Sequence, residues 1–200
     1  MAIKLHKSRL KGVTPLSLLQ DNIFHGKKIV EVTREHVKYY RDLRINEAIA
    51  KIIRQCNGTL GAAGSQKNGC LYRESGLPEF WNKNNSENVI CDHAIPVTEL
   101  VRMHVNEGTP IEALIFYPVV RIKKSTNDTL TKIGYAKGGT KNGFPLFRYS
   151  HLENIQLLTH HGDPVDPKTW TTQDHWRLVK STPELEDILA AFNLNDITRD

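Results

Sequence analysis

The sequence predicts an α+β protein with helices towards both ends and short strands in the middle. Apolar residues recur at helical spacing over residues 33–56, which indicates a long amphipathic helix. Two short runs rich in β-branched residues, 89–91 and 119–122, are typical of strands. A Thr-Pro pair opens a further helical stretch at 183–192. A chain of 200 residues fits one domain of ordinary size.

Composition narrows the class of protein and of partner. Hydrophobic residues make up 39% and charged residues 24% of the chain, which excludes wholesale disorder. Lysine and arginine outnumber the acidic residues by 27 to 22, and a net charge of +5 favours a polyanionic partner. No run reaches the roughly 18 apolar residues of a membrane span, so we expect no membrane partner.

The number and spacing of the cysteines indicate whether disulfide bonds or a structural zinc site are expected. Cys56, Cys70 and Cys91 are odd in number and form no C-x-x-C pair. Neither a disulfide framework nor a structural zinc site is expected from them. Reduced thiols in a cytoplasmic protein are the expectation.

Residues 1–88 are expected to form a helical and loop-rich region. A short helix is predicted at 14–19, and a glycine turn leads from it into a strand at 29–32. The long helix at 33–56 ends at an Asn-Gly pair, and the glycines and asparagines of 58–88 predict loops. This region is a candidate for DNA recognition.

The middle of the chain mixes helices and strands. Helices are predicted at 97–105 and 111–116, and a strand at 117–122 turns back into a second strand at 129–135. A basic, glycine-rich loop follows at 137–143. Lysines in and before this loop are candidates for contact with DNA phosphates, although a solvated hairpin tip explains them equally well. They are Lys123, Lys124, Lys137 and Lys141.

The last third predicts one strand and three helices. The strand is expected at 147–150. A short helix at 154–161 is then broken by a glycine and a proline, and longer helices are expected at 170–179 and 183–192. The two last helices are interpreted as packing elements.

An Asp-His pair at the end of the run 89–91 is the strongest chemical signal. Asp92 and His93 are adjacent, so on a strand their side chains point to opposite faces. Phosphodiester hydrolysis needs a base, a cation and a means of fixing the tautomer of the base. Asn154, if it came back beside His93, would accept one imidazole N–H and leave the other nitrogen as the base.

These residues resemble a known enzyme family. Asp92-His93-Ala94-Ile95-Pro96, followed by Asn154-Ile155-Gln156-Leu157-Leu158, is similar to the motif of the HNH endonucleases, also called ββα-metal or His-Me finger enzymes. The resemblance implies His93 as general base, Asn154 as the residue that orients it, and Asp92 as a metal ligand. The match is confined to residues 89–97 and 147–166.

The resemblance also implies a domain layout. It places a ββα-metal nuclease core at 89–166, with a long insertion at about 97–146 between the two core strands. Helices at 167–200 would pack on this core. The gap between the two motifs is longer than usual for the family, and the cysteine pairs that many members use for zinc are absent.

The second metal ligand is left open by the pattern. The last ligand of the family falls at Asp163, but the glycine and proline around it could end the helix too early. His161 or His160 would then serve. In some members of the wider superfamily the helix asparagine binds the metal, so Asn154 is a further alternative.

The function implied is that of a metal-dependent DNA endonuclease of restriction or homing type. It would cleave double-stranded DNA with one divalent cation, for which Mg²⁺ is expected and Mn²⁺ or another ion could substitute. Two-fold DNA targets would favour a homodimer. The alternatives are a non-catalytic nucleic-acid-binding protein on the same scaffold and a nonspecific DNase or RNase. Metal-dependent cleavage separates them.

Overall fold

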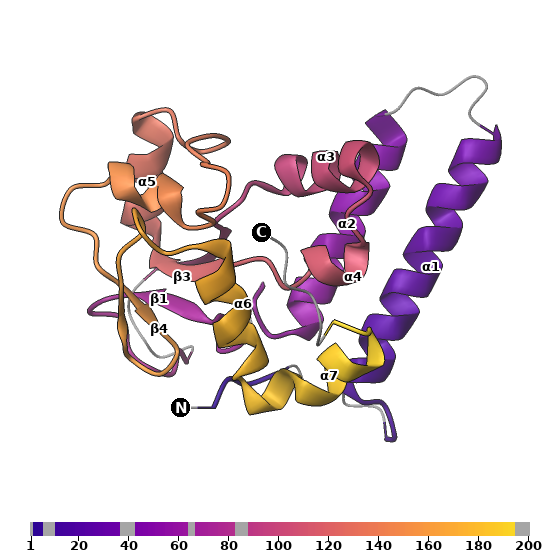
Figure 1. Cartoon of the computed structure of the whole chain (residues 1–200), viewed down its shortest axis with the longest axis horizontal. Helices are drawn as coiled ribbons and strands as arrows, with labels where there is room; N and C mark the ends of the chain where they lie inside the picture. Colours follow the sequence, from indigo (N-terminus) through magenta and orange to yellow (C-terminus); the bar gives the residue numbers. More distant parts are fainter. Residues whose placement is uncertain (1, 6–10, 37–42, 64–66, 83–87, 195–200) are drawn as a thin grey trace.

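The computed structural model describes residues 2–5, 11–36, 43–63, 67–82 and 88–194. Within these ranges it contains seven α-helices and one open, mixed sheet of five strands, which confirms the α+β class. Two long helices lie side by side at one end of the molecule, and the sheet lies at the other end (Figure 1).

The elements have the following bounds. The α-helices are α1 (Pro15–His36), α2 (Leu43–Thr59), α3 (Val97–Glu107), α4 (Ile111–Leu114), α5 (Lys124–Lys132), α6 (Thr172–Lys180) and α7 (Glu186–Ala191). Two 3-10 turns are η1 (Phe147–His151) and η2 (Pro183–Leu185). The strands are β1 (Tyr72–Glu74), β2 (Val89–His93), β3 (Val119–Lys123), β4 (Leu157–Thr159) and β5 (Pro164–Val165).

The sheet has the strand order β2-β3-β1-β4-β5. Only β1 and β3 pair in parallel, and all other neighbours are antiparallel. The register aligns Asp92, Val120, Tyr72 and Thr159 in one row across four strands. Three steps of about 4.8 Å therefore separate β2 from β4 by about 14 Å. The central strand β1 comes from the region predicted to be loops.

The face of the sheet that carries Tyr72 packs against the C-terminal helices. The indole N–H of Trp170 donates to the Tyr72 hydroxyl at 3.1 Å, which lies 2.8 Å from Nδ1 of His175 in α6. Nε2 of His175 lies 2.8 Å from the carbonyl oxygen of Phe116. Because that carbonyl can only accept, Nε2 carries the proton and Nδ1 accepts from Tyr72. Every polar atom of this buried chain of contacts is satisfied.

The predicted turn and strand at 25–32 are wrong, because this segment lies in the middle of α1. Ile23 and Val30 are buried at helical spacing. A Cβ atom on Gly26 would lie 2.2 Å from the side chain of Ile52 in α2. The glycine therefore lets the two helices approach closely, and it does not mark a turn. The predicted helix at 33–56 spans the end of α1, residues 37–42 outside the described ranges, and most of α2.

The second strand of the predicted hairpin, 129–135, is also wrong, since α5 occupies most of it. Glu74 explains the start of this helix. Its Oε2 accepts the backbone N–H of Lys123 at 2.9 Å and the hydroxyl of Thr126 at 2.8 Å. Leu130 is fully buried on the inner side of the helix. Tertiary contacts thus decide a segment whose local sequence is ambiguous.

Two further predictions fail around the second motif. Residues 147–150 form a 3-10 turn and not a strand, and its consecutive residues Arg148 and Tyr149 are both buried. Residues 154–161 form no helix. Asn154 has a positive φ of 63° and β4 follows it. The second strand and the helix expected for a ββα-metal unit are therefore both absent from their predicted positions at 147–150 and 154–161. The predicted helices at 97–105, 111–116 and 170–179 are confirmed with small shifts of their ends, whereas 183–192 is divided into the 3-10 turn η2 and helix α7.

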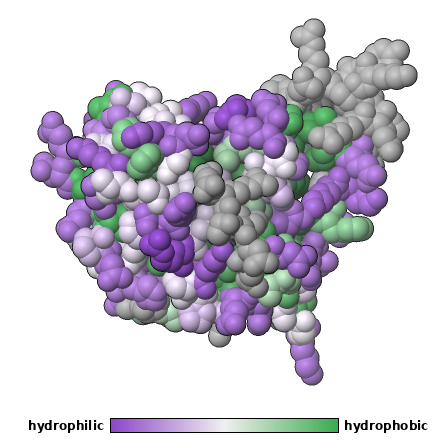
Figure 2. All heavy atoms as spheres, in the orientation of Figure 1, coloured by the Kyte–Doolittle hydropathy of each residue, from purple (hydrophilic) through white to green (hydrophobic). Residues whose placement is uncertain are grey.

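The surface agrees with the composition. Hydrophilic side chains cover most of the face in view, and apolar ones form small separated patches (Figure 2). Among the described helices, none combines the length and the apolar character that crossing a membrane requires.

Candidate active site

Asp92 and His93 end strand β2, and their side chains contact different elements, as the strand geometry predicts. Asp92 contacts the 3-10 turn η1, whereas His93 contacts helix α2. Strand pairing stops directly afterwards, where the N–H of Ala94 donates to the carbonyl of Pro118. Pro96 then precedes helix α3. The two side chains therefore lie at the end of an edge strand, where the backbone turns away.

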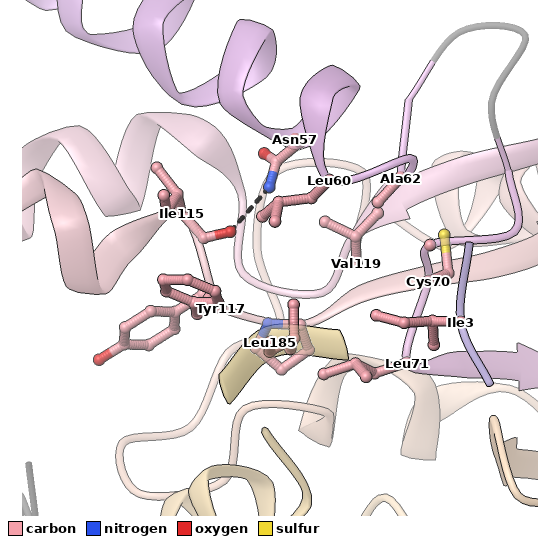
Figure 3. A pocket seen from close by; sticks show the side chains of 13 residues that line it. Ile3, Asn57, Leu60, Ala62, Cys70, Leu71, Ile115, Tyr117, Val119 and Leu185 are labelled. Carbon is pink, nitrogen blue, oxygen red and sulfur yellow. Dashed lines mark hydrogen bonds between the residues drawn. The ribbon is translucent and has the colours of Figure 1, made fainter. Parts of the chain in front are cut away.

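His93 is held by Asn57, a residue that sequence reasoning took for a helix stop. Nε2 of His93 lies 2.9 Å from Oδ1 of Asn57. The amide nitrogen of Asn57 donates to the carbonyl oxygen of Ile115 at 2.9 Å, a contact drawn in Figure 3. Since this contact uses the amide N–H, Oδ1 is the acceptor and Nε2 of His93 is the donor. The lone pair of neutral His93 is therefore on Nδ1.

The electrostatic surroundings keep His93 neutral. Burial lowers the pKa of His93, and the positive charges of Arg54 and Arg148 add to this shift, which brings the pKa to about 4. Arg54 is exposed on α2, one turn before Asn57. It supplies a positive charge near the imidazole. The sequence gives one indication of the contact between Asn57 and His93, which is that a polar asparagine follows the apolar stripe of α2. In the structure Asn57 is only 2% exposed.

Asp92 is held by two neighbours in η1. The Tyr149 hydroxyl donates to Oδ2 of Asp92 at 2.7 Å, and Nη2 of Arg148 lies 3.4 Å from the same oxygen. Nη1 of Arg148 donates to the backbone carbonyl of His93 at 2.8 Å. Burial raises the pKa of Asp92, while Arg148 and Tyr149 oppose that shift. Arg148 thus joins the two adjacent site residues from one side.

The residues present fit a cation that is bound by one carboxylate better than a metal site whose ligands all come from the protein. Oδ1 of Asp92 has no hydrogen-bond partner among the described residues, and the side chain is 14% exposed. Within the same ranges, no three histidine, cysteine or acidic residues come together in a way that could hold a metal. Mg²⁺ often takes one or two carboxylates and completes its shell with water and substrate phosphate oxygens. Asp92 alone could contribute to such a shell.

The second motif does not reach this site. Asn154 is exposed and forms no hydrogen bond with His93, whose Nε2 contacts Asn57 instead. His161 and Asp163 are exposed in the turn between β4 and β5, where Asp163 contacts Thr159. Strands β3 and β1 separate that turn from β2. The contact with His93 that was predicted for Asn154 is therefore made by Asn57, and the predicted ligands His161 and Asp163 lie across the sheet.

The candidate DNA-binding lysines fall into separate surfaces. Lys123 and Lys124 line one recess at the start of α5, and Lys123 lies 3.6 Å from Glu74. Lys141 lies over the rings of Phe144 and Phe147 and lines a different groove, together with acidic residues of α3. Lys137 is exposed in the loop before it. The four lysines do not line one common recess.

Comparison of the chain with protein families, with curated proteins and with solved structures finds no match. The candidate site is therefore assigned from its own geometry. That geometry is a neutral imidazole with a fixed tautomer, next to a carboxylate with one open oxygen and near an exposed arginine.

Proposed function

We propose that the chain is a metal-dependent DNA endonuclease in which His93 is the general base. The observation that carries the proposal is the contact of His93 with Asn57, which leaves the lone pair on Nδ1. A general base must be held in the correct tautomer before the substrate binds, and this contact provides that preorganisation. The net charge of +5 supports a polyanionic substrate.

In the proposed reaction, Nδ1 of His93 removes a proton from a water molecule as the water oxygen bonds to phosphorus. The bond from phosphorus to the leaving oxygen breaks, and that oxygen takes a proton from solvent. The products carry a 5′-phosphate and a 3′-hydroxyl. Arg54 would contact the phosphate, because its exposed guanidinium lies near the imidazole.

Asp92 would hold the cation through its open oxygen Oδ1. The cation, when bound, would neutralise charge on the phosphate. Arg148 and Tyr149 act as positioning residues, because they occupy Oδ2 and thereby fix the direction of Oδ1. Neither would touch the substrate, since both are buried.

The test is cleavage of supercoiled plasmid DNA with Mg²⁺, Mn²⁺ or EDTA. Wild type is compared with His93→Ala and with a matched control, His161→Ala, which changes an exposed histidine on the far turn. We expect cleavage that needs metal, a loss of about 10²–10⁴-fold in His93→Ala, and no change in the control. Discrete fragments would support sequence-specific cutting, and a smear a nonspecific nuclease.

Two outcomes contradict the proposal. Equal cleavage by His93→Ala and wild type would remove His93 as the base. DNA retardation without cleavage under every metal condition would favour the non-catalytic binding protein. An RNA substrate run in parallel separates a DNase from an RNase.

A further inference from the structure

Two arginines face each other on neighbouring strands without a carboxylate between them. Arg73 in β1 and Arg121 in β3 are partners in the parallel register, so their side chains leave the same face of the sheet. Among the described residues, neither forms an ion pair with an acidic side chain. Like charges at paired positions repel each other. An anion bound beside the two guanidinium groups would offset this repulsion.

The contacts of Arg121 satisfy only part of its guanidinium. Arg121 is 4% exposed. Its Nη1 donates to Oδ1 of Asn68 at 2.9 Å, and Nη2 donates to the carbonyls of Pro78 and Glu79 at 2.6 and 2.7 Å. The Nε–H groups of Arg121 and Arg73 are both buried and have no partner. A buried donor without an acceptor is costly, so the pair of Nε–H groups is unexplained by the protein alone.

A third unpartnered group joins them. His160, directly after β4, is 8% exposed, and both of its ring nitrogens are buried without a hydrogen-bond partner. Its backbone N–H donates to the carbonyl of Leu71, which places it next to β1. Arg73, Arg121 and His160 line one cavity, together with Glu79 and Phe80. Unlike the residues of the candidate active site, they come from the central strands β3 and β1 and from the residue that directly follows the adjacent strand β4.

The size of this cavity limits what it can take. Its volume is about 20 Å³. A buried water needs about 10–15 Å³ on this scale, so the cavity accommodates one oxygen-sized group. A water molecule would accept only two hydrogen bonds and would leave the two positive charges unbalanced. An anionic oxygen accepts three hydrogen bonds and supplies the missing charge.

We propose that this cavity binds one oxygen of a phosphate group, with donors from Nε of Arg73, Nε of Arg121 and the His160 ring. The remaining phosphate oxygens would lie at the rim. The group could belong to inorganic phosphate or to the terminal phosphate of a nucleic acid strand. The proposal does not depend on the function proposed for His93, because it concerns binding at a different part of the sheet.

The first test titrates the protein with inorganic phosphate at constant ionic strength, balanced with sodium chloride, in the presence of EDTA. Thermal unfolding is the readout, because a ligand that binds only the folded state raises the Tm. We expect a saturable rise for wild type and at least a tenfold weaker apparent affinity for Arg73→Gln. The matched control is Arg177→Gln, which removes the same charge from a side chain that is 75% exposed. It should respond like wild type.

Phosphate and chloride with equal effects, or equal responses of Arg73→Gln and wild type, would overturn the proposal. If Arg73→Gln does not fold, the ring ¹⁵N signals of His160 in wild type give the answer. These signals should move on addition of phosphate, and unchanged signals would contradict phosphate binding. Oligonucleotides with and without a 5′-phosphate then separate the two sources. EDTA prevents metal-dependent cleavage, so a failure here says nothing about His93.

Discussion

Oδ1 of Asn57 lies 2.9 Å from Nε2 of His93, and the same amide donates to the carbonyl of Ile115. One buried side chain at the end of α2 thereby connects strand β2 with the segment that follows α4. Both contacts restrict the amide to one orientation, and that orientation fixes the proton of His93 on Nε2. The candidate base is therefore set by a residue 36 positions earlier in the chain.

The first prediction concerns the tautomer of His93. In Asn57→Ala the imidazole loses its acceptor, so we expect the Nε2–H form to give way to a mixture of the two neutral tautomers. Asn57→Asp keeps an acceptor and should keep the Nε2–H form. Ring ¹⁵N chemical shifts of labelled protein at pH 7 distinguish the tautomers without any substrate. An unchanged His93 spectrum in Asn57→Ala would show that another group holds the ring.

The ion pair of Arg148 and Asp92 predicts that removing Arg148 destabilises the protein much more than removing an exposed arginine. Arg148 is 1% exposed, so Arg148→Met leaves the largely buried Asp92 carboxylate without its cationic partner. We expect a cost of about 3–5 kcal/mol in urea unfolding, and a smaller cost for the double variant Arg148→Met, Asp92→Asn. The matched control Arg177→Met breaks an exposed pair with Asp174 and should change stability by less than about 1 kcal/mol. Equal costs for Arg148→Met and the control would contradict this description.

His175 predicts a dependence of stability on pH. Burial lowers the pKa of His175 to about 4 from an ordinary 6.5, although its hydrogen bond to the carbonyl of Phe116 opposes that shift. Between pH 6.5 and 4 the unfolded chain binds a proton that the folded chain does not. This stabilisation is complete above pH 6.5 and is lost as the pH falls, by about 3 kcal/mol in total.

Burial also lowers the pKa values of His93 and His160 to about 4, so wild type should lose stability from several groups in the same window. The contribution of His175 is therefore measured as a difference. Urea unfolding at several pH values gives the free energy of unfolding as a function of pH. This free energy should fall less steeply with falling pH for His175→Gln than for wild type. Parallel slopes for the two proteins would rule out a neutral, buried His175 in the folded state.

Two glycines form a matched pair for the packing of α1 on α2. A Cβ atom at Gly26 would lie 2.2 Å from Ile52, so Gly26→Ala should overpack the helix contact and cost about 1–3 kcal/mol. A Cβ atom at Gly58, in the last turn of α2, would meet nothing within 4 Å. Gly58→Ala should stabilise the protein by up to about 1 kcal/mol. Thermal unfolding compares them, and a neutral or stabilising Gly26→Ala would contradict the close crossing.

Local patterns were sufficient for part of the fold. Strand β2 and helix α3 follow from a β-branched run and from a helical stripe that ends at Gly108. Long-range contacts decide the segments that were predicted wrongly. Gly26 is understood only once Ile52 lies against it, and the start of α5 depends on Glu74, which is 49 residues from Lys123. Such contacts leave no periodic signal in the sequence.

In the candidate site, too, local sequence predicts some features and long-range contacts decide the others. The motif correctly identified a strand end where Asp92 and His93 point to different partners. It could not identify the partners, because Asn57 looks like a helix stop and Arg148 and Tyr149 look like alternating strand residues. Asn154 was favoured by its spacing in a motif, but sheet order places two strands between β4 and β2. Strand order is a property of the whole chain and cannot be inferred from two short stretches.

The most direct measurement is the rate of plasmid cleavage with Mg²⁺ for wild type, Asn57→Ala and Asn154→Gly. Glycine is chosen at position 154 because it tolerates the positive φ of 63° found there. If Asn57 positions the general base, Asn57→Ala should lose at least tenfold in rate and Asn154→Gly should cleave like wild type. Loss of cleavage in Asn154→Gly with full activity in Asn57→Ala would contradict the site described and favour the arrangement implied by the sequence motif.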